Sequence, residues 1–283
     1  MDGLVQEEAG ETPYRSIGGD PGLGLLILCD HAENTIPERN NSLGLRSEDL
    51  HRHIAYDLGA AGVAEQLAQL LNAPAILARF SRLLIDPNRG LDDPTLIMQL
   101  SDGLIVPGNV GLDAAGIADR IDRFYQPYHQ AVDRAIDAGI KSGKPPVVVA
   151  LHSFTQAWKG VLRPWSVAVL WDKDKRLAEP LLKGLRTISG IVVGDNVPYS
   201  GQLKGDTLYR HATKRGLAQA LIELRQDLIL SEEAQAEWAG RLAEALREVL
   251  RSGERLHEIV RHGPHTDWTD GAGSAAERTD GHG

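Results

Sequence analysis

The sequence predicts a single α/β domain of three layers, with a mostly parallel, mixed sheet between two layers of helices. Two observations predict this class. Short apolar runs of strand length alternate with longer segments of helical periodicity along most of the 283 residues. The apolar runs are nearly continuous, which is typical of strands buried on both faces. A chain of this length can fold as one unit around one core.

The strands are predicted where an apolar run ends in Gly, Pro, Asp or Asn, and the helices where apolar residues recur every three or four positions. The expected strands are residues 24–29, 75–77, 83–85, 147–151, 166–170, 191–193 and 218–224. The expected helices are residues 47–72, 115–138, 176–189, 207–215 and 232–252. Residues 89–112 are rich in Asp, Gly and Pro and are expected to form an extended loop over the sheet, where binding residues often lie.

The two ends of the chain differ in composition from its middle. We expect residues 1–20 to be a polar lead-in, residues 21–260 to be the catalytic domain, and residues 261–283 to be a disordered tail. The tail has almost no aliphatic side chains, so it cannot bury enough apolar surface to offset its ordering entropy.

Composition excludes several classes of function. The net charge of −9 argues against nucleic acid, which favours clustered Lys and Arg. The acidic N-terminus has no apolar core of a secretory signal, and no run approaches the roughly 20 apolar residues of a membrane span. A soluble, cytoplasmic protein is therefore expected, and its oligomeric state stays open. The single cysteine, Cys29, permits no internal disulfide and is expected to pack as a small apolar residue.

Two histidines follow two of the predicted strands. His31 comes directly after residues 24–29, and His152 directly after residues 147–151. Carboxyl ends of parallel strands meet at one rim of a sheet, so the two imidazoles suggest a metal site or a catalytic pair. Two histidines, one carboxylate and an open position form a common catalytic zinc set, in which water becomes acidic enough to attack near neutral pH. For either histidine alone, a bond to a backbone carbonyl is the simpler explanation.

Three carboxylates are candidates for the third metal ligand beside the two histidines. Asp30 precedes His31, Glu33 follows it by two residues, and Asp57 lies on the next predicted helix. Asp57 also fits a charge on a helix surface. Its place in an apolar-rich turn favours a position at the rim of the sheet.

Polar side chains that could hold a substrate carboxylate follow other strands. Arg89 can bind a carboxylate with two hydrogen bonds and Asn88 can add an amide contact, although Asp-Pro-Asn is also good turn chemistry. Tyr199, Arg210 and His211 belong to a later strand-end loop and the helix after it. Arg210 is a candidate second clamp and His211 a polar contact, but ordinary turn and helix-surface roles explain these residues equally well.

Glu223 lies near the end of the apolar run 218–224. A carboxylate there is costly unless it is paired or functional. Beside a metal it could take a proton from the attacking water and return it to the leaving amine. The alternative is an ion pair with Arg225 at the edge of the sheet, because period-two alternation puts both side chains on one face.

These strings together resemble the N-formylglutamate amidohydrolase family over roughly residues 24–250. The matching motifs are Asp-His-Ala-x-Asn-x-Ile-Pro, His-Ile-Ala-Tyr-Asp-Leu-Gly-Ala, Phe-Ser-Arg-Leu-Leu-Ile-Asp-Pro-Asn-Arg, Leu-His-Ser-Phe-Thr, Gly-Asp-Asn-x-Pro-Tyr-Ser-Gly and Glu-Leu-Arg-Gln-Asp-Leu-Ile. That family is similar in fold to the zinc carboxypeptidases and aspartoacylase, so the resemblance implies a zinc-carboxypeptidase-like fold.

The resemblance also implies roles for individual residues. His31 and His152 would be metal ligands, Asn88 and Arg89 carboxylate binders, and Glu223 the general base. The relatives carry Glu three residues after the first histidine, where this sequence has Asn34. Asp57 is therefore the preferred third ligand, ahead of Glu33 and Asp30.

The expected activity is metal-dependent hydrolysis of an N-acyl amino acid, with Zn²⁺ or another divalent metal as cofactor. The lead case is N-formyl-L-glutamate and water giving formate and L-glutamate, a step of amino-acid catabolism. The small N-acyl amino acid is then the expected partner. The alternatives are a different N-acyl amino acid or small peptide as substrate, or a non-catalytic binding protein that retains the pocket.

Overall fold

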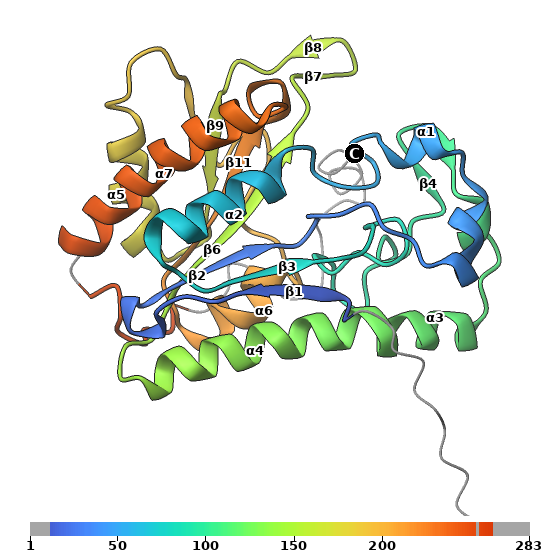
Figure 1. Ribbon diagram of the computed structural model, residues 1–283, viewed down its shortest axis with the longest axis horizontal. Helices are drawn as coiled ribbons and strands as arrows, with labels where there is room; N and C mark the ends of the chain where they lie inside the picture. The colour runs from blue at the N-terminus through green and yellow to red at the C-terminus, as the bar shows by residue number, and fades with distance from the viewer. Residues whose placement is uncertain (1–11, 253–254, 263–283) are drawn as a thin grey trace, which may run out of the picture.

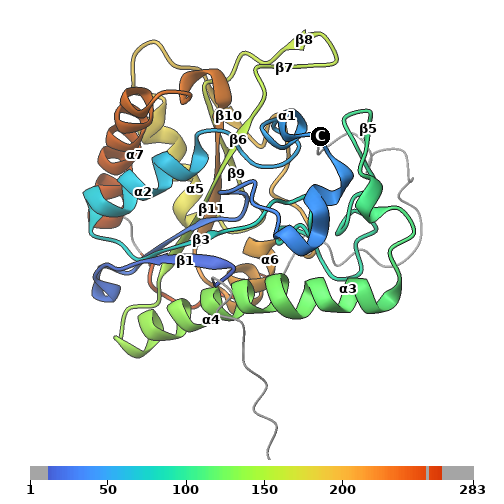
Figure 2. The ribbon, with the colours of Figure 1, turned by 45° about the vertical axis from the view of Figure 1, so that its right-hand side comes forward.

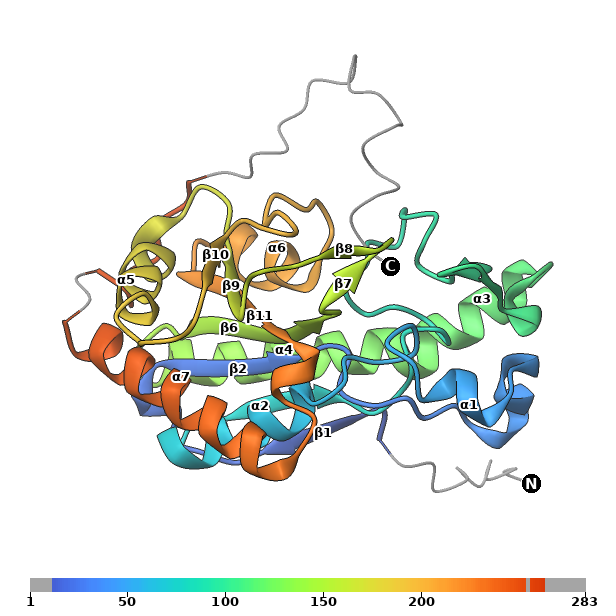
Figure 3. The ribbon, with the colours of Figure 1, turned by 90° about the horizontal axis from the view of Figure 1, so that it is seen from above.

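The computed structural model describes residues 12–252 and 255–262, which form a seven-stranded mixed sheet between two layers of helices (Figures 1 and 3). Strands β3, β2, β6 and β11 are parallel, β1 and β9 run antiparallel to their neighbours β3 and β11, and β10 is parallel to β9. The predicted single three-layer α/β domain is thus confirmed. The order across the sheet is β1 (Tyr14–Ile17), β3 (Ala75–Ala78), β2 (Leu25–Cys29), β6 (Val147–Phe154), β11 (Gln219–Arg225), β9 (Val167–Leu170) and β10 (Val193–Asp195).

Each face of the sheet is covered by its own helices. One face packs against α2 (Ala60–Leu71), α5 (Lys175–Leu185) and α7 (Glu232–Ser252). The other packs against α4 (Gln126–Lys141) and α6 (Thr207–His211), as Figures 1 and 2 show. Short segments of 3-10 helix lie in several of the remaining connections: Pro21–Leu23, Glu38–Gly44, Pro107–Asn109, Thr213–Arg215 and Gln226–Leu228. Glu38–Gly44 is kinked, with positive φ at Asn41, Ser42 and Leu43.

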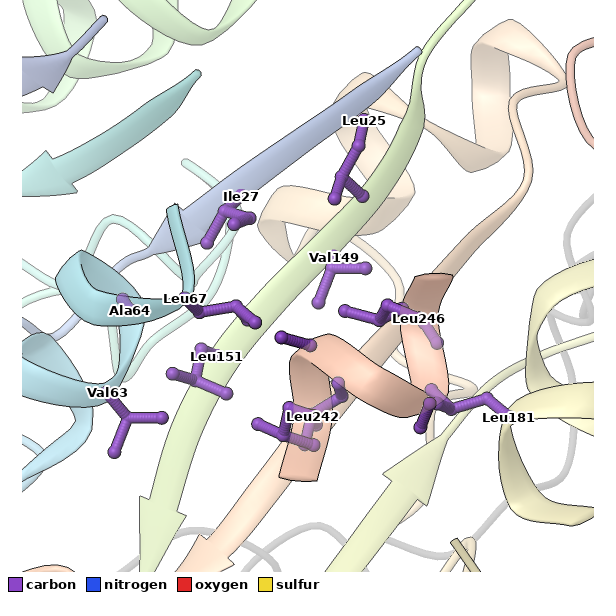
Figure 4. Close-up of a cluster of buried hydrophobic side chains, with 14 of the residues drawn as sticks. Leu25, Ile27, Val63, Ala64, Leu67, Val149, Leu151, Leu181, Leu242 and Leu246 are labelled. Carbon is purple, nitrogen blue, oxygen red and sulfur yellow. The ribbon is translucent and has the colours of Figure 1, made fainter. Parts of the chain in front are cut away.

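The strands bury side chains on both faces, as their continuous apolar runs predict. In β2, Leu25 and Ile27 join Leu67 of α2 and Leu242 of α7 in one core cluster (Figure 4). The alternate residues Leu26 and Leu28 join the cluster on the α4 side. Burying a leucine side chain stabilises the fold by about 1.5–3 kcal/mol, so this alternation fixes which face each side chain takes.

The structure differs from the expected elements at both ends of the chain. Part of the lead-in expected over residues 1–20 forms β1, an edge strand whose Tyr14 pairs with Ala78 of β3. Residues 1–11 and 263–283 lie outside the described residues, so almost all of the tail expected over 261–283 stays a prediction.

The strand expected at residues 83–85 is wrong. These residues form a turn in which the Leu84 N–H donates to the Ser81 carbonyl over 2.9 Å. Their side chains are fully buried on the α4 side of the sheet. An apolar run indicates burial, and here it cannot distinguish a buried turn from a strand.

Two expected helices are interrupted. The helix expected over 47–72 ends after α1 (Ser47–Leu50) and resumes only at α2. Gly59 starts the second part with φ +77°, and a Cβ there would lie 2.2 Å from the Ile229 carbonyl oxygen, so only glycine fits. The helix expected over 115–138 runs as α3 (Ala114–Arg120), a π turn (Ile121–Tyr125) and α4. The turn between α1 and α2 carries Asp57.

Two small hairpins interrupt the loops beyond the main sheet. The loop expected over 89–112 contains β4 (Leu100–Ser101) and β5 (Leu104–Ile105). β7 (Ala157–Trp158) and β8 (Val161–Leu162) follow directly from the carboxyl end of β6 (Figure 2). Among the described residues, no helix is long and apolar enough to cross a membrane.

Candidate metal centre and its cleft

Three buried side chains converge at the carboxyl ends of β2 and β6. His31 follows β2, His152 lies inside β6, and Asp57 comes from the turn before α2, where its N–H donates to the His31 carbonyl over 2.9 Å. The two imidazole centroids are 4.9 Å apart. Asp57 Oδ2 lies 2.9 Å from His152 Nδ1 and 3.5 Å from His31 Nδ1. The sequence predicted that the two histidines would share one rim, and the structure brings them together there with Asp57.

Two further carboxylates fix the orientation of the imidazoles. His31 Nε2 lies 2.7 Å from Asp86 Oδ1, and His152 Nε2 lies 3.0 Å from Asp30 Oδ2. When the Nε2 atoms of neutral rings donate to these carboxylates, the lone pairs of both Nδ1 atoms face Asp57 and are left to bind a cation. His31 Nδ1 is buried with no hydrogen-bond partner. A metal ion would satisfy this nitrogen, so the donor set fits a cation held by His31, Asp57 and His152.

The other two carboxylates that the sequence offered as ligands take different positions. Asp30 lies behind His152, where its Oδ1 accepts hydrogen bonds from Tyr128 and Thr207. Glu33 accepts from Thr35 and lies 3.7 Å from the Arg79 guanidinium, away from the imidazoles. The geometry therefore favours Asp57 as the third donor.

The protonation of this cluster follows from its neighbours. Burial alone would raise the pKa of Asp57, but the His31 and His152 rings lower it well below its usual range. Burial alone would lower the pKa of His152, but Asp30 and Asp57 raise it well above normal. Without a metal, the His152 ring therefore carries a proton at neutral pH, and a divalent cation bound to the cluster would displace that proton.

Glu223 lies next to the cluster, on the neighbouring strand. It is the register partner of His152 across the parallel β6–β11 pair, so both side chains point to the same face of the sheet. Its Oε2 is buried without a hydrogen-bond partner, and burial raises its pKa to about 8. The alternative ion pair with Arg225 does not form, because Arg225 binds Asp227 instead, at 2.7 Å.

A cleft opens beside these residues and includes two of the predicted substrate contacts, Asn88 and Tyr199. Asn88 Oδ1 accepts a hydrogen bond from the Thr207 N–H over 3.0 Å. The guanidinium of Arg89 turns away to Thr95 Oγ1 and the Asn88 carbonyl, and its side chain does not line the cleft.

Sequence reasoning missed Arg82, a lining residue of the cleft. Its guanidinium lies 3.2 Å from Asp86 and 3.6 Å from Asp57. The signal was present in the Phe80-Ser81-Arg82 string. Arg82 comes before the apolar run at 83–85, whereas the strand-end pattern selects residues that follow such runs.

Arg210 and His211 lie on the α4 side, away from the cleft. Arg210 donates to the Tyr125 hydroxyl over 3.0 Å. His211 is buried between Asp133, 2.9 Å from its Nδ1, and His129, whose Nδ1 is 2.7 Å from its Nε2. As substrate contacts, these two residues stay predictions that the geometry does not support.

The buried His129 gives the protein a pH-dependent stability. Burial, and next the adjacent His211, lower the pKa of His129 well below its usual 6.5. Its Nε2 has no hydrogen-bond partner, so a proton there would be unsatisfied. As the pH falls from 7 to 5, His129 takes up a proton in the unfolded chain but stays neutral in the folded protein. This difference alone lowers the free energy of unfolding by up to about 1.4 kcal/mol per pH unit.

We expect His129→Gln to flatten the fall of unfolding free energy between pH 7 and pH 5, as measured by urea titration. His51→Gln, which removes an exposed imidazole, is the control. An H129Q slope equal to that of the unsubstituted protein would contradict a neutral His129 in the folded state.

The three-layer α/β fold carries a buried His-Asp-His group at the rim of its sheet, and its family makes the chain a hydrolase that acts on amide bonds. It belongs to the N-formylglutamate amidohydrolase family, which matches residues 23–230. It is similar to a solved gene product of Agrobacterium tumefaciens, with 35% identity over 86% of this chain and 96% of that chain and a TM-score of 0.80. It also shares the fold of N-formylglutamate amidohydrolase from Ralstonia eutropha, with 21% identity over 87% of this chain and 99% of that chain and a TM-score of 0.63. No curated protein matches the sequence.

Proposed function

We propose that the protein is a metal-dependent amidohydrolase that converts N-formyl-L-glutamate and water to formate and L-glutamate. The observation that carries the proposal is the convergence of His31 Nδ1, His152 Nδ1 and Asp57 Oδ2 beside Glu223, in a chain of this family. His31, His152 and Asp57 would hold the metal. Two histidines and a carboxylate favour Zn²⁺, which when bound lowers the pKa of water and polarises a carbonyl group.

Glu223 supplies the proton transfers in this proposal. The water oxygen attacks the formyl carbon while Glu223 takes one proton from the water. The carbon–nitrogen bond then breaks, and Glu223 returns the proton to the leaving amine of glutamate. The position of its carboxylate next to His152, with one oxygen unpartnered, supports this role. Its pKa of about 8 would be lowered by a divalent cation held beside it, so that the carboxylate would be ionised and could accept the proton at neutral pH.

Arg82 and Asn88 line the same cleft and can act on the substrate directly. The Arg82 guanidinium can stabilise the negative charge that develops on the carbonyl oxygen during attack. The carboxylates of Asp57 and Asp86 orient it by lying on its two sides. The Asn88 side chain can donate a hydrogen bond to a substrate carboxylate.

The size of the cleft favours a small acyl group. The cleft is narrow and partly open to solvent, with a cavity volume of about 40 Å³ that holds roughly three water molecules. Leu170, Leu203 and Leu221 form apolar parts of its wall. A formyl group fits such a space, whereas a long acyl chain would require the leucines to move.

Release of formate by the purified protein tests the proposal. We expect turnover of N-formyl-L-glutamate when Zn²⁺ is present, loss of turnover after chelation, and recovery when Zn²⁺ is restored. N-acetyl-L-glutamate and longer acyl forms are expected to react at least about tenfold more slowly, because each methylene that must be accommodated costs about 1–3 kcal/mol.

Two results would contradict different parts of the proposal. Faster hydrolysis of a substrate with a longer acyl group would show that the formyl group is not the preferred acyl group, although the reaction would still be amide hydrolysis. Full activity after removal of all bound metal would show that the reaction does not require a metal.

A further inference from the structure

Arg163 lies against three residues that line the cleft, Phe154, Thr155 and Tyr199, and takes no part in the reaction described above. It follows β8 directly, and its peptide N–H donates to the Gln156 carbonyl over 2.9 Å, which closes the β7–β8 hairpin. Its carbonyl accepts from Arg225 on β11. The backbone is therefore held from both sides, and the position of the side chain is set by the hairpin.

The guanidinium of Arg163 is surrounded by residues of the cleft wall. It lies 5.2 Å from the ring centre of Tyr199 and 5.8 Å from that of Phe154. Its Nη1 donates to the hydroxyl and carbonyl oxygens of Thr155 over 3.0 and 3.3 Å. Tyr199, Phe154 and Thr155 all line the cleft. Trp158 of the hairpin is a third aromatic neighbour, with its ring centre 5.7 Å from the guanidinium.

The charge on Arg163 lowers the pKa of the Glu223 carboxylate, which burial raises, but no carboxylate of the described residues is in direct contact with the guanidinium to balance it. Within residues 12–252 and 255–262, it makes no ion pair, although only 8% of its surface is exposed. Aromatic faces and a threonine hold the guanidinium but leave its charge in place. Arg82 and Arg89, by contrast, lie 3.2 and 3.9 Å from the Asp86 carboxylate. A buried arginine without a carboxylate partner is unusual, because burying an unpaired charge is costly.

We propose that Arg163, with Tyr199 beside it, receives a carboxylate of the amino-acid half of the substrate. The inference rests on the proposed function and deepens it by naming a specificity-determining residue. The ligand chemistry is a carboxylate group, which the planar guanidinium can bind with two parallel hydrogen bonds. An acidic N-formyl amino acid offers two such groups, its α-carboxylate and its side-chain carboxylate.

Paired substrates test this subsite. N-formyl-L-glutamine replaces the side-chain carboxylate by a neutral amide of the same size, and the α-amide of N-formyl-L-glutamate does the same for the α-carboxylate. We expect the unsubstituted protein to lose about 10- to 100-fold in kcat/KM on the substrate that lacks the group bound by Arg163. In Arg163→Gln that difference is expected to vanish, mainly through a higher KM for N-formyl-L-glutamate. Arg163→Lys should restore part of it.

The matched control is Lys159→Gln, which removes a positive charge from the same hairpin. It is expected to keep the discrimination of the unsubstituted protein. If R163Q no longer distinguishes N-formyl-L-glutamate from N-formyl-L-glutamine, Arg163 binds the side-chain carboxylate. If R163Q no longer distinguishes N-formyl-L-glutamate from its α-amide, Arg163 binds the α-carboxylate. Retention of both differences in R163Q overturns the inference and leaves the proposed reaction standing. Equal rates on all three substrates in the unsubstituted protein overturn it without any variant.

Binding of glutarate separates this inference from the proposed function. If no N-formyl amino acid is hydrolysed, the proposed reaction fails, but calorimetry with glutarate and the zinc-loaded protein still measures the carboxylate subsite. We expect R163Q to weaken the Kd for glutarate at least about tenfold. Equal Kd values in R163Q and the unsubstituted protein, or no binding to either, contradict the subsite.

Discussion

Asp57→Asn is expected to lower both metal affinity and the rate of amide hydrolysis by at least about 100-fold. Residues that only orient a metal ligand cost about 10- to 100-fold when they are replaced, and a ligand should cost no less. The amide keeps the size of Asp57 but removes the negative charge that lies 2.9 Å from His152 and 3.5 Å from His31. Bound zinc per chain, measured by elemental analysis, and formate release are the two readouts.

Glu33→Gln is the matched control, since it makes the same chemical change at the carboxylate that lies next to His31 in sequence. Glu33 contacts Thr35 and Arg79 instead of the imidazoles, so zinc content and turnover should stay unchanged. Asp30→Asn is expected to fall between the two, because Asp30 only orients His152 through Nε2. Zinc retained in D57N but lost in E33Q would reverse the assignment of the third ligand.

The sequence predicts much of this arrangement because strand ends are easy to recognise. A continuous apolar run ending in a polar residue indicates a buried strand that reaches the rim. That pattern places His31, His152 and Glu223 at one edge of the sheet before any coordinates are known. Asp57 required a resemblance as well, because it lies in a turn that the pattern assigned to a continuous helix.

The residues that sequence reasoning missed have contacts that no local pattern encodes. Arg163 follows a strand of two residues, Val161–Leu162, which is too short to show a period. Its position near Tyr199 arises from a hairpin meeting a loop about 36 residues further along the chain, and only tertiary structure brings the two together. Arg210 shows the opposite case, and its role as a clamp stays a prediction. An arginine in a strand-end loop region suggested a clamp, but α6 turns it toward Tyr125 and α4.

Glu223→Gln is expected to reduce kcat for formate release by about 10²- to 10⁴-fold, the usual contribution of a general base. Gln has nearly the same shape as Glu but cannot accept a proton from water at neutral pH. Glu223 is not among the three donors that face each other at the candidate metal site. Zinc content should therefore stay at the level of the unsubstituted protein, which distinguishes this variant from D57N.

Glu223→Asp tests whether position as well as charge matters. The shorter side chain keeps the carboxylate but draws it back by about one carbon–carbon bond, and misplacement of about 1 Å can cost about 10²-fold. We expect E223D to lie between E223Q and the unsubstituted protein in kcat, with similar melting temperatures for all three. If zinc-loaded E223Q retained more than about a tenth of the original kcat, Glu223 would not be the group that transfers the protons. The proton would then have to pass through another group of the cleft, and His53, which also lines it, would be the next residue to replace.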